Sequence, residues 1–231
     1  MLSIVPTPIG NLRDITLRAV ETLKGADMIV CEDTRQTQKL LSAYEIKKPF
    51  MSFHEHSALA KMQEIFRMLE EGKNLALVSD GGMPLISDPG FQIVNEAIRR
   101  KIPFEVLPGP SAVIMALAAS GLATDSFSFF GFPPPKSVSR KKYFADLAER
   151  EETLIFFESP HRILQSLEDM KAVFGDREAA VARELTKKFE EIQRGSLEDL
   201  VVKFSSKKAL GEITVLIAGK ARKKLFTAGN S

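Results

Sequence analysis

Three loops rich in glycine and proline are the first segments whose residue types suggest a binding site. They are residues 6–11, 79–84 and 108–111, and each follows a short apolar run typical of a β-strand. Glycine lets backbone groups approach a ligand closely, and proline stiffens a loop, which lowers the entropy lost on binding. Any one loop is typical of an ordinary tight turn. Together they predict a small-molecule site, because ligands of open α/β sheets bind at the carboxyl ends of the strands.

The loops do not contain the two commonest nucleotide motifs. None matches the G-x-G-x-x-G pattern of dinucleotide sites or the G-x-x-x-x-G-K-[ST] pattern of P-loops. The sequence therefore gives no support to an NAD-binding or ATP-binding site of either kind.

Strands and helices alternate in the first half of the chain and must position these loops. Strands are predicted at residues 3–5, 28–31, 75–78 and 104–107, with helical apolar spacing between them. This alternation predicts a parallel sheet flanked by helices. The uninterrupted apolar run at 75–78 indicates a sheet covered on both faces.

A domain boundary is predicted near residues 121–125. The sequence thus predicts an N-terminal α/β domain at 1–121, a C-terminal α/β domain at 122–219 and a basic, frayed tail at 220–231. Within the second domain the predicted strands are residues 127–132, 153–157, 179–182 and 213–218.

Composition bounds the class of protein. The chain has 231 residues, of which 44% are hydrophobic and 27% charged, as in globular domains with buried cores. Cys31 is the single cysteine, which excludes an internal disulfide and a cysteine-cluster metal site. No signal peptide or membrane span of ~20 apolar residues is visible, so we expect a cytoplasmic protein. The net charge of +2 is too small to indicate nucleic acid by itself.

Six segments in a fixed order carry a resemblance to a known family. They read PTPIGNLRDIT (6–16), CEDTR (31–35), LVSDGGMPLISDPG (77–90), FESPHRI (157–163), RELTKKFEE (183–191) and GEITVLI (211–217). Together they resemble the bacterial ribosomal RNA cytidine 2′-O-methyltransferases, a branch of the tetrapyrrole-methylase superfamily. The resemblance extends from about residue 4 to about residue 219.

This resemblance implies the two-domain α/β tetrapyrrole-methylase (class III methyltransferase) fold, with a mainly parallel N-terminal sheet and a mixed C-terminal sheet. It also implies a homodimer and a cleft for S-adenosylmethionine that both domains complete. The family usually has Thr or Ser where Met83 stands, so a contact there is expected from the backbone. The implied cofactor-binding residues are Pro8, Ser79, Asp80, Gly82, Met83, Pro84, Ile86, Ser111, Ala112, Leu185, Thr186, Ile213 and Thr214.

Methyl transfer to a ribose hydroxyl requires in-line alignment, and deprotonation of the hydroxyl contributes about 10²–10⁴-fold to the rate. The candidate catalytic residues are Glu158, which follows a predicted strand, His161, whose imidazole is the side chain most often used as a general base, and Lys187. Lys187 can act as a base, stabilise an alkoxide or contact a phosphate. An alternative for Ser159 and Pro160 is a helix start, as N-cap and first helical residue. An aligned hydroxyl with no dedicated base also remains open.

RNA requires phosphate contacts, which basic residues supply. A cluster after the aromatic run at 127–132 is the best candidate, although a solvated helix face has the same pattern. The near-neutral net charge favours an assembled small ribosomal subunit over free RNA as the substrate. The candidate RNA-binding residues are Arg35, Lys136, Arg140, Lys141, Lys142 and Arg162.

No metal is expected. His54 and His56 would share one face of a strand, but no third ligand is evident nearby and methyl transfer needs no metal. A polar surface facing RNA is the favoured interpretation of these two histidines.

Two other functions stay open at this stage. One keeps the fold and changes the acceptor to a tetrapyrrole such as a precorrin, which would need a large apolar cleft. The other is a ribosome-associated protein that binds S-adenosylmethionine without transferring its methyl group.

Overall fold

The computed structural model describes residues 1–53, 58–87, 90–206 and 209–220. His54, His56 and the tail beyond Lys220 lie outside the described residues. The chain forms two compact units, Met1–Ala112 and Val113–Ser231. The division falls after the first residue of the helix Ala112–Ser120. The domain ranges 1–121 and 122–219 stay predictions.

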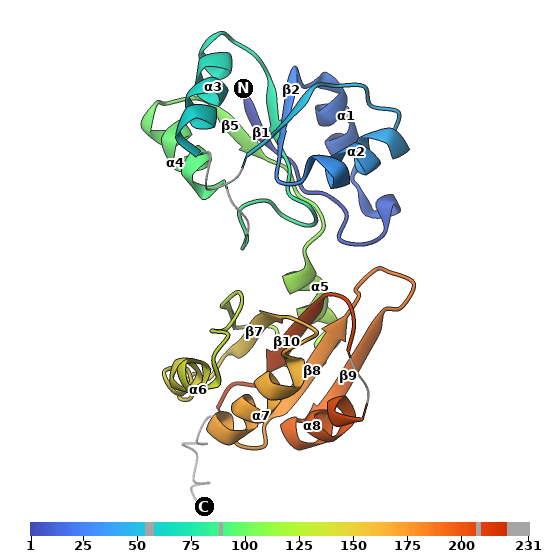
Figure 1. The fold of residues 1–231 in the computed structure, drawn as a ribbon, viewed down its shortest axis with the longest axis vertical. Helices are drawn as coiled ribbons and strands as arrows, with labels where there is room; N and C mark the ends of the chain where they lie inside the picture. The colour runs from blue at the N-terminus through green and yellow to red at the C-terminus, as the bar shows by residue number, and fades with distance from the viewer. Residues whose placement is uncertain (54–57, 88–89, 207–208, 221–231) are drawn as a thin grey trace, which may run out of the picture. The chain divides into compact units, whose positions relative to one another are not determined.

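The first unit alternates strands and helices as the sequence predicts (Figure 1). Its elements are β1 (Leu2–Ile4), η1 (Leu12–Asp14), α1 (Leu17–Gly25), β2 (Met28–Cys31), α2 (Thr34–Ala43), β3 (Phe50–Ser52), α3 (Ala58–Glu70), β4 (Leu75–Leu77), α4 (Phe91–Arg99) and β5 (Phe104–Val106).

The five strands of this unit form a parallel sheet in the order β3-β2-β4-β1-β5. Ile4 at the end of β1 pairs with Leu77 of β4 on one side and Val106 of β5 on the other. The predicted parallel sheet is confirmed. Its register places the carboxyl ends of three neighbouring strands side by side, directly before the three Gly/Pro loops.

Both faces of this sheet are covered, as the apolar run at 75–78 indicates. Leu75 and Leu77 belong to a core cluster with residues of α3 and α4. Ala76 and Val78 point to the opposite face and belong to a cluster with residues of α1 and α2. Figure 1 shows these two helix pairs on opposite sides of the sheet.

The second unit is a mixed sheet with helices packed on it. Its elements are α5 (Ala112–Ser120), which begins at the boundary residue, β6 (Phe127–Phe129), α6 (Ser137–Ala145), β7 (Thr153–Glu158), α7 (Ile163–Phe174), β8 (Glu178–Arg183), β9 (Glu191–Ser196), α8 (Leu197–Ser205) and β10 (Ile213–Ile217). The strand order is β6-β7-β10-β8-β9, and only β6 and β7 pair in parallel. The predicted mixed sheet is confirmed.

One apolar cluster holds this unit together. Phe156 of β7, Leu167 of α7, Leu197 of α8 and Val215 of β10 are all fully buried in it. The predicted strand at 127–132 is shorter than expected, since β6 ends at Phe129.

The sequence interpretation missed β9 and α8. β9 is an edge strand that pairs only with β8, and its residues Glu191–Ser196 are largely polar. It therefore lacks the apolar signal of a buried strand. α8 begins with a capping box between Ser196 and Asp199, in which Asp replaces the usual Glu or Gln.

No helix among the described residues is long and apolar enough to cross a membrane.

Candidate functional site

The loops after β1 and β4 are joined by a short antiparallel bridge. The Thr7 amide donates to the Gly82 carbonyl at 3.0 Å, and the Gly82 amide donates to the Thr7 carbonyl at 2.9 Å. The Thr7 hydroxyl also donates to the carbonyl of Ser79 at 3.0 Å. Because Thr7 and Ser79 are both buried, these bonds fix the two loops against each other.

Glycine is required where the third loop joins them. A Cβ on Gly109 would lie 2.6 Å from Cβ of Pro6, which is closer than real atoms approach. Gly82 has a φ of +91°, and a Cβ there would lie 3.3 Å from the Ile9 side chain and 3.8 Å from the Pro110 carbonyl. The structure thus brings the three loops together at one edge of the sheet, as the sequence predicts.

The loop after β4 continues through strained backbone. Leu85 and Ser87 have φ values of +76° and +67°, a region that side chains other than Gly rarely adopt. Such strain persists only where the surroundings enforce it, and it is concentrated at functional sites. Ile86 lies exposed between the two strained residues, whereas Pro84 is buried.

An acidic pair connects this edge to the start of α2. Oδ1 of Asp80 accepts a 3.0 Å hydrogen bond from the Asp33 amide, and Asp33 caps α2 by accepting from the Arg35 amide at 2.8 Å. The Arg35 side chain, which hydrogen-bonds to Asp33, lowers the pKa of that carboxyl to about 2. Arg35 stays 86% exposed and can therefore reach a phosphate, although Asp33 balances part of its charge.

The second unit also gathers predicted residues at one sheet edge. Ile213, the first residue of β10, pairs with Glu158 at the end of β7 and with Arg183 at the end of β8. The carboxyl ends of β7 and β8 and the start of β10 therefore lie together. This edge carries the predicted residues Glu158, Leu185, Thr186, Lys187, Ile213 and Thr214.

Glu158 is bound on both carboxylate oxygens and its side chain is 0% exposed. Oε1 accepts from the Ser159 amide at 2.6 Å and pairs with Nη2 of Arg162 at 2.7 Å, and Oε2 accepts from the Ser166 hydroxyl. A general base must contact the proton that it removes. This arrangement favours a role for Glu158 in holding Arg162 and the turn after β7 over the role of a base.

The segment after Glu158 is a turn that precedes the helix. α7 begins at Ile163 with Arg162 as its N-cap residue, so Ser159 and Pro160 are not the cap and first residue of the helix. The Ser159 carbonyl instead accepts from the amides of Arg162 and Ile163, each at 3.0 Å. His161 lies exposed on this turn, which leaves its ring accessible to a substrate.

Lys187 is held by two carboxylates. Its Nζ lies 2.8 Å from Oε1 of Glu184 and 3.3 Å from Oε2 of Glu212. Burial lowers the pKa of the Lys187 ammonium, but the Glu184 hydrogen bond and the Glu212 charge outweigh it and raise the pKa above its ordinary value. A charged ammonium cannot accept a proton, so the structure favours Lys187 as a fixed cation over Lys187 as a base.

Thr186 has an unusual environment next to this ion pair. Its φ is +66°, and its Oγ1 is buried without a hydrogen-bond partner in the described part of the chain. Leu185, which precedes it, is buried, as is Ile213, which belongs to the core of the unit. β10 pairs along both edges, so the sheet uses much of the backbone of Ile213 and Thr214.

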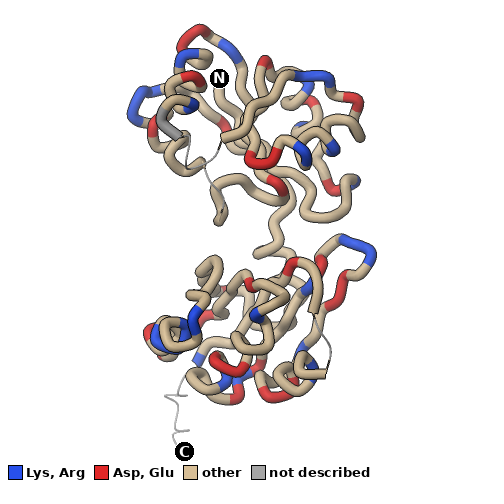
Figure 2. Tube along the Cα trace, viewed as in Figure 1, with Lys and Arg blue, Asp and Glu red and all other residues tan. Residues whose placement is uncertain are grey.

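The basic helix α6 contains one residue that is not available to RNA. Arg140 is 0% exposed and pairs with Asp169 of α7, with Nε and Nη2 lying 2.8 and 2.7 Å from Oδ2. Its expected role in RNA binding is therefore corrected to one in packing α6 on α7. Lys136, Lys141 and Lys142 are exposed, and Figure 2 shows basic residues gathered on this helix.

The comparison with known proteins decides the family. A family model described as tetrapyrrole (corrin/porphyrin) methylases matches residues 1–201. The chain belongs to this family. Over 219 residues this methylase is 47% identical to the ribosomal RNA small subunit methyltransferase I of Thermotoga maritima, covering 95% of the chain and 98% of the relative. The protein of the same name from Bacillus subtilis is 45% identical, with 95% and 75% covered.

Solved structures show the same fold at low identity. The diphthine synthase structure superposes on this methylase with a TM-score of 0.68 at 18% identity, covering 94% of this chain and 89% of that one. The cobalt precorrin-4 methyltransferase structure gives a TM-score of 0.67 at 19% identity, covering 94% of each chain. The predicted tetrapyrrole-methylase fold is confirmed.

Three residues of these edges were not singled out from the sequence. Thr7 and Gly109 fall inside the quoted loops, and the crowding of Pro and Gly around them was the available signal. Glu184 stands in the RELT segment, but no sequence pattern predicts its φ of +53° or its contact with Glu212.

Proposed function

We propose that this methylase transfers a methyl group from S-adenosylmethionine to small-subunit ribosomal RNA, and that the acceptor is the ribose 2′-hydroxyl of a cytidine. The observation that carries the proposal is the similarity over nearly the whole chain, at 45–48% identity, to proteins named ribosomal RNA small subunit methyltransferase I. The tetrapyrrole enzymes among the structural neighbours are only 19–21% identical and support the fold alone.

The residues present fit a methyl donor of this kind. The first-unit loops form a cradle that a Cβ at Gly82 or Gly109 would crowd, and the second unit has a buried, unpartnered hydroxyl on Thr186 among the described residues. When bound, S-adenosylmethionine supplies an electrophilic methyl group on a sulfonium. The proposed contacts are Pro8, Ser79, Asp80, Gly82, Met83, Pro84, Ile86, Ser111 and Ala112 of the first unit and its boundary, with Leu185, Thr186, Ile213 and Thr214 of the second.

During methyl transfer the ribose hydroxyl loses its proton and negative charge develops on its oxygen. Residues of this chain must accept the proton and stabilise the charge. We propose that Lys187 stabilises this charge, because its ammonium is held in place by Glu184 and Glu212 and can stabilise an alkoxide. His161 is the candidate proton acceptor, because it is exposed and histidine is the side chain that most often serves as a general base. Glu158 keeps Arg162 oriented.

RNA is proposed to bind through exposed basic residues. A net charge of +2 gives little general attraction to a polyanion, so local contacts must supply it and an assembled small subunit suits this protein better than free RNA. We further propose that the protein is a cytoplasmic homodimer, as the family resemblance implies. The proposed phosphate contacts are Arg35, Lys136, Lys141, Lys142 and Arg162.

The test is methyl transfer in vitro from isotopically labelled S-adenosylmethionine to unmethylated small ribosomal subunits and to free rRNA. Mass spectrometry of the nucleosides is expected to place the label in 2′-O-methylcytidine. Alkaline hydrolysis is an independent check, because a 2′-O-methyl group prevents cleavage of the adjacent phosphodiester. Label on a base would overturn the ribose assignment. Absence of transfer by protein that binds the donor would support a non-catalytic binder instead.

A further inference from the structure

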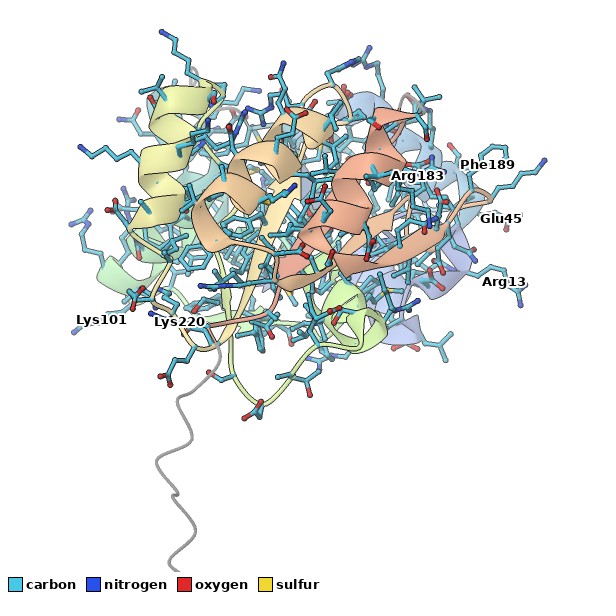
Figure 3. The ribbon with its side chains drawn as sticks, turned by 90° about the horizontal axis from the view of Figure 1, so that it is seen from below. Arg13, Glu45, Lys101, Arg183, Phe189 and Lys220 are labelled. Carbon is cyan, nitrogen blue, oxygen red and sulfur yellow. The ribbon has the colours of Figure 1, made fainter. Side chains whose placement is uncertain are left out.

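Among the described residues of the second unit, the non-glycine residues with positive φ lie in the β8–β9 connection. Figure 3 labels Arg183 at its start and the exposed Phe189 near its tip. Glu184 and Thr186 have φ values of +53° and +66°, so two non-glycine residues within three positions adopt left-handed backbone. Such backbone persists only where neighbouring contacts enforce it.

Glu184 supplies those contacts. Its amide donates to the Glu212 carbonyl at 2.9 Å, and its Oε1 accepts from the Glu212 amide at 3.0 Å and from Nζ of Lys187 at 2.8 Å. The Lys187 ammonium lowers the pKa of Glu184, so this carboxylate is charged at neutral pH. One side chain therefore ties the turn at 184–187 to the residue that precedes β10.

Gly211 gives this contact its space. It has a φ of +85°, and a Cβ there would overlap the Glu184 carboxylate. The Glu184 side chain thus occupies the space that a side chain at residue 211 would need. Because Gly211 has no side chain, the Glu184 carboxylate can reach the Glu212 amide just before β10.

Within this turn the Thr186 hydroxyl has no hydrogen-bond partner among the described residues. The Thr186 amide donates to Oε2 of Glu190 at 2.5 Å, but its hydroxyl is buried and unpaired among the described residues. Leaving a buried hydroxyl unpaired is unfavourable, and a hydrogen bond to a ligand atom would remove that cost.

We propose that Glu184 is a positioning residue: its carboxylate locks the turn at 184–187 onto the start of β10 and so presents the Thr186 hydroxyl to the bound methyl donor. This inference rests on the proposed function, because it takes the ligand to be S-adenosylmethionine. Glu184 itself touches only protein atoms, and its effect on binding of the donor passes through Thr186.

The test compares three variants by calorimetric titration with S-adenosylmethionine and by thermal unfolding. Glu184→Ala is expected to weaken binding about tenfold or more, since a small misplacement of contacting groups is costly. Glu184→Gln keeps an oxygen for the Glu212 amide and is expected to recover most of the affinity. Glu191→Gln is the matched control, because it removes another carboxylate of the same hairpin, one that pairs with Arg183 at 3.0 Å, and should leave binding unchanged.

Hydrogen exchange of the ligand-free protein provides a readout that does not depend on the donor. Glu184→Ala is expected to speed exchange at the Glu212 amide, and Gly211→Ala is expected to do the same by displacing the carboxylate. Unchanged exchange, or unchanged donor affinity in folded Glu184→Ala, would overturn the positioning role alone. Wild-type protein that binds neither S-adenosylmethionine nor S-adenosylhomocysteine would instead overturn the proposed function, and the role of Glu184 with it.

Discussion

The two units build their candidate edges in different ways. In the first unit the loops are held by backbone hydrogen bonds and by the absence of side chains, as at Gly82 and Gly109. In the second unit buried or half-buried carboxylates hold the turns, with Glu158 fixing one and Glu184 the other. We call the loops around Gly82 and Gly109 the backbone cradle, and the carboxylates of Glu158 and Glu184 the carboxylate clamps. The cradle tolerates little added side-chain volume, whereas a clamp tolerates little loss of charge or hydrogen bonding.

This difference explains why the first edge is easier to predict from sequence. A cradle needs Gly and Pro at short spacing after apolar strands, and residues 79–84 and 108–111 carry that pattern. A clamp depends on a partner far along the chain, as Glu184 depends on Glu212.

The largest expected effect comes from breaking a clamp. Glu158→Ala removes the ion-pair partner of half-buried Arg162 and the acceptor for the Ser159 amide and the Ser166 hydroxyl. We therefore expect a loss of about 3–5 kcal/mol in the free energy of unfolding. Chemical denaturation of purified protein measures it. If Glu158 were instead a free general base, Glu158→Gln would abolish methyl transfer and leave stability unchanged.

Added side-chain volume should destabilise the cradle of the first unit. Gly109→Ala places a Cβ against the Pro6 ring, and we expect it to cost about 1–3 kcal/mol in unfolding free energy and to weaken binding of S-adenosylmethionine. Gly25→Ala is the matched control, because nothing lies within 4 Å of the added Cβ. Equal behaviour of the two variants would contradict a packed cradle.

The pH dependence of methyl transfer tests whether Lys187 of the second unit is a fixed cation or a base. Its pKa is raised and that of Glu184 is lowered, so their pairing is lost only as pH falls through the lowered pKa of Glu184 or rises through the raised pKa of Lys187. Between about pH 6 and about pH 9 both groups therefore stay charged. We expect Lys187→Gln to lower the rate of methyl transfer without changing the shape of the pH–rate profile in that range. Loss of an ascending limb in this variant would instead identify Lys187 as the base.

The smallest expected effects lie on the exposed basic residues. Lys142→Ala should weaken binding to small subunits only a few fold and should reduce the slope of log affinity against log salt by less than about one unit, because one cation meets one phosphate. Its stability should not change, because Lys142 is exposed. A matched measurement on Arg140→Ala should show the reverse, a large loss of stability, because that side chain is buried against Asp169.

The sequence predicted most of the fold for physical reasons that the structure makes visible. Leu75 to Val78 carry an uninterrupted apolar pattern because both faces of the parallel sheet are covered. β9 was missed because an edge strand has only one partner and needs no apolar run. Arg140 was misassigned because a basic helix face looks the same in sequence whether a cation meets water or, as here, a buried Asp169.

The central claim is that these edges serve a methyltransferase that uses S-adenosylmethionine. Calorimetric titration of the folded protein with S-adenosylmethionine and with S-adenosylhomocysteine tests it most directly. The account predicts that both compounds bind, and that Gly109→Ala in the first unit and Glu184→Ala in the second each weaken binding. Folded wild-type protein that binds neither compound would contradict it.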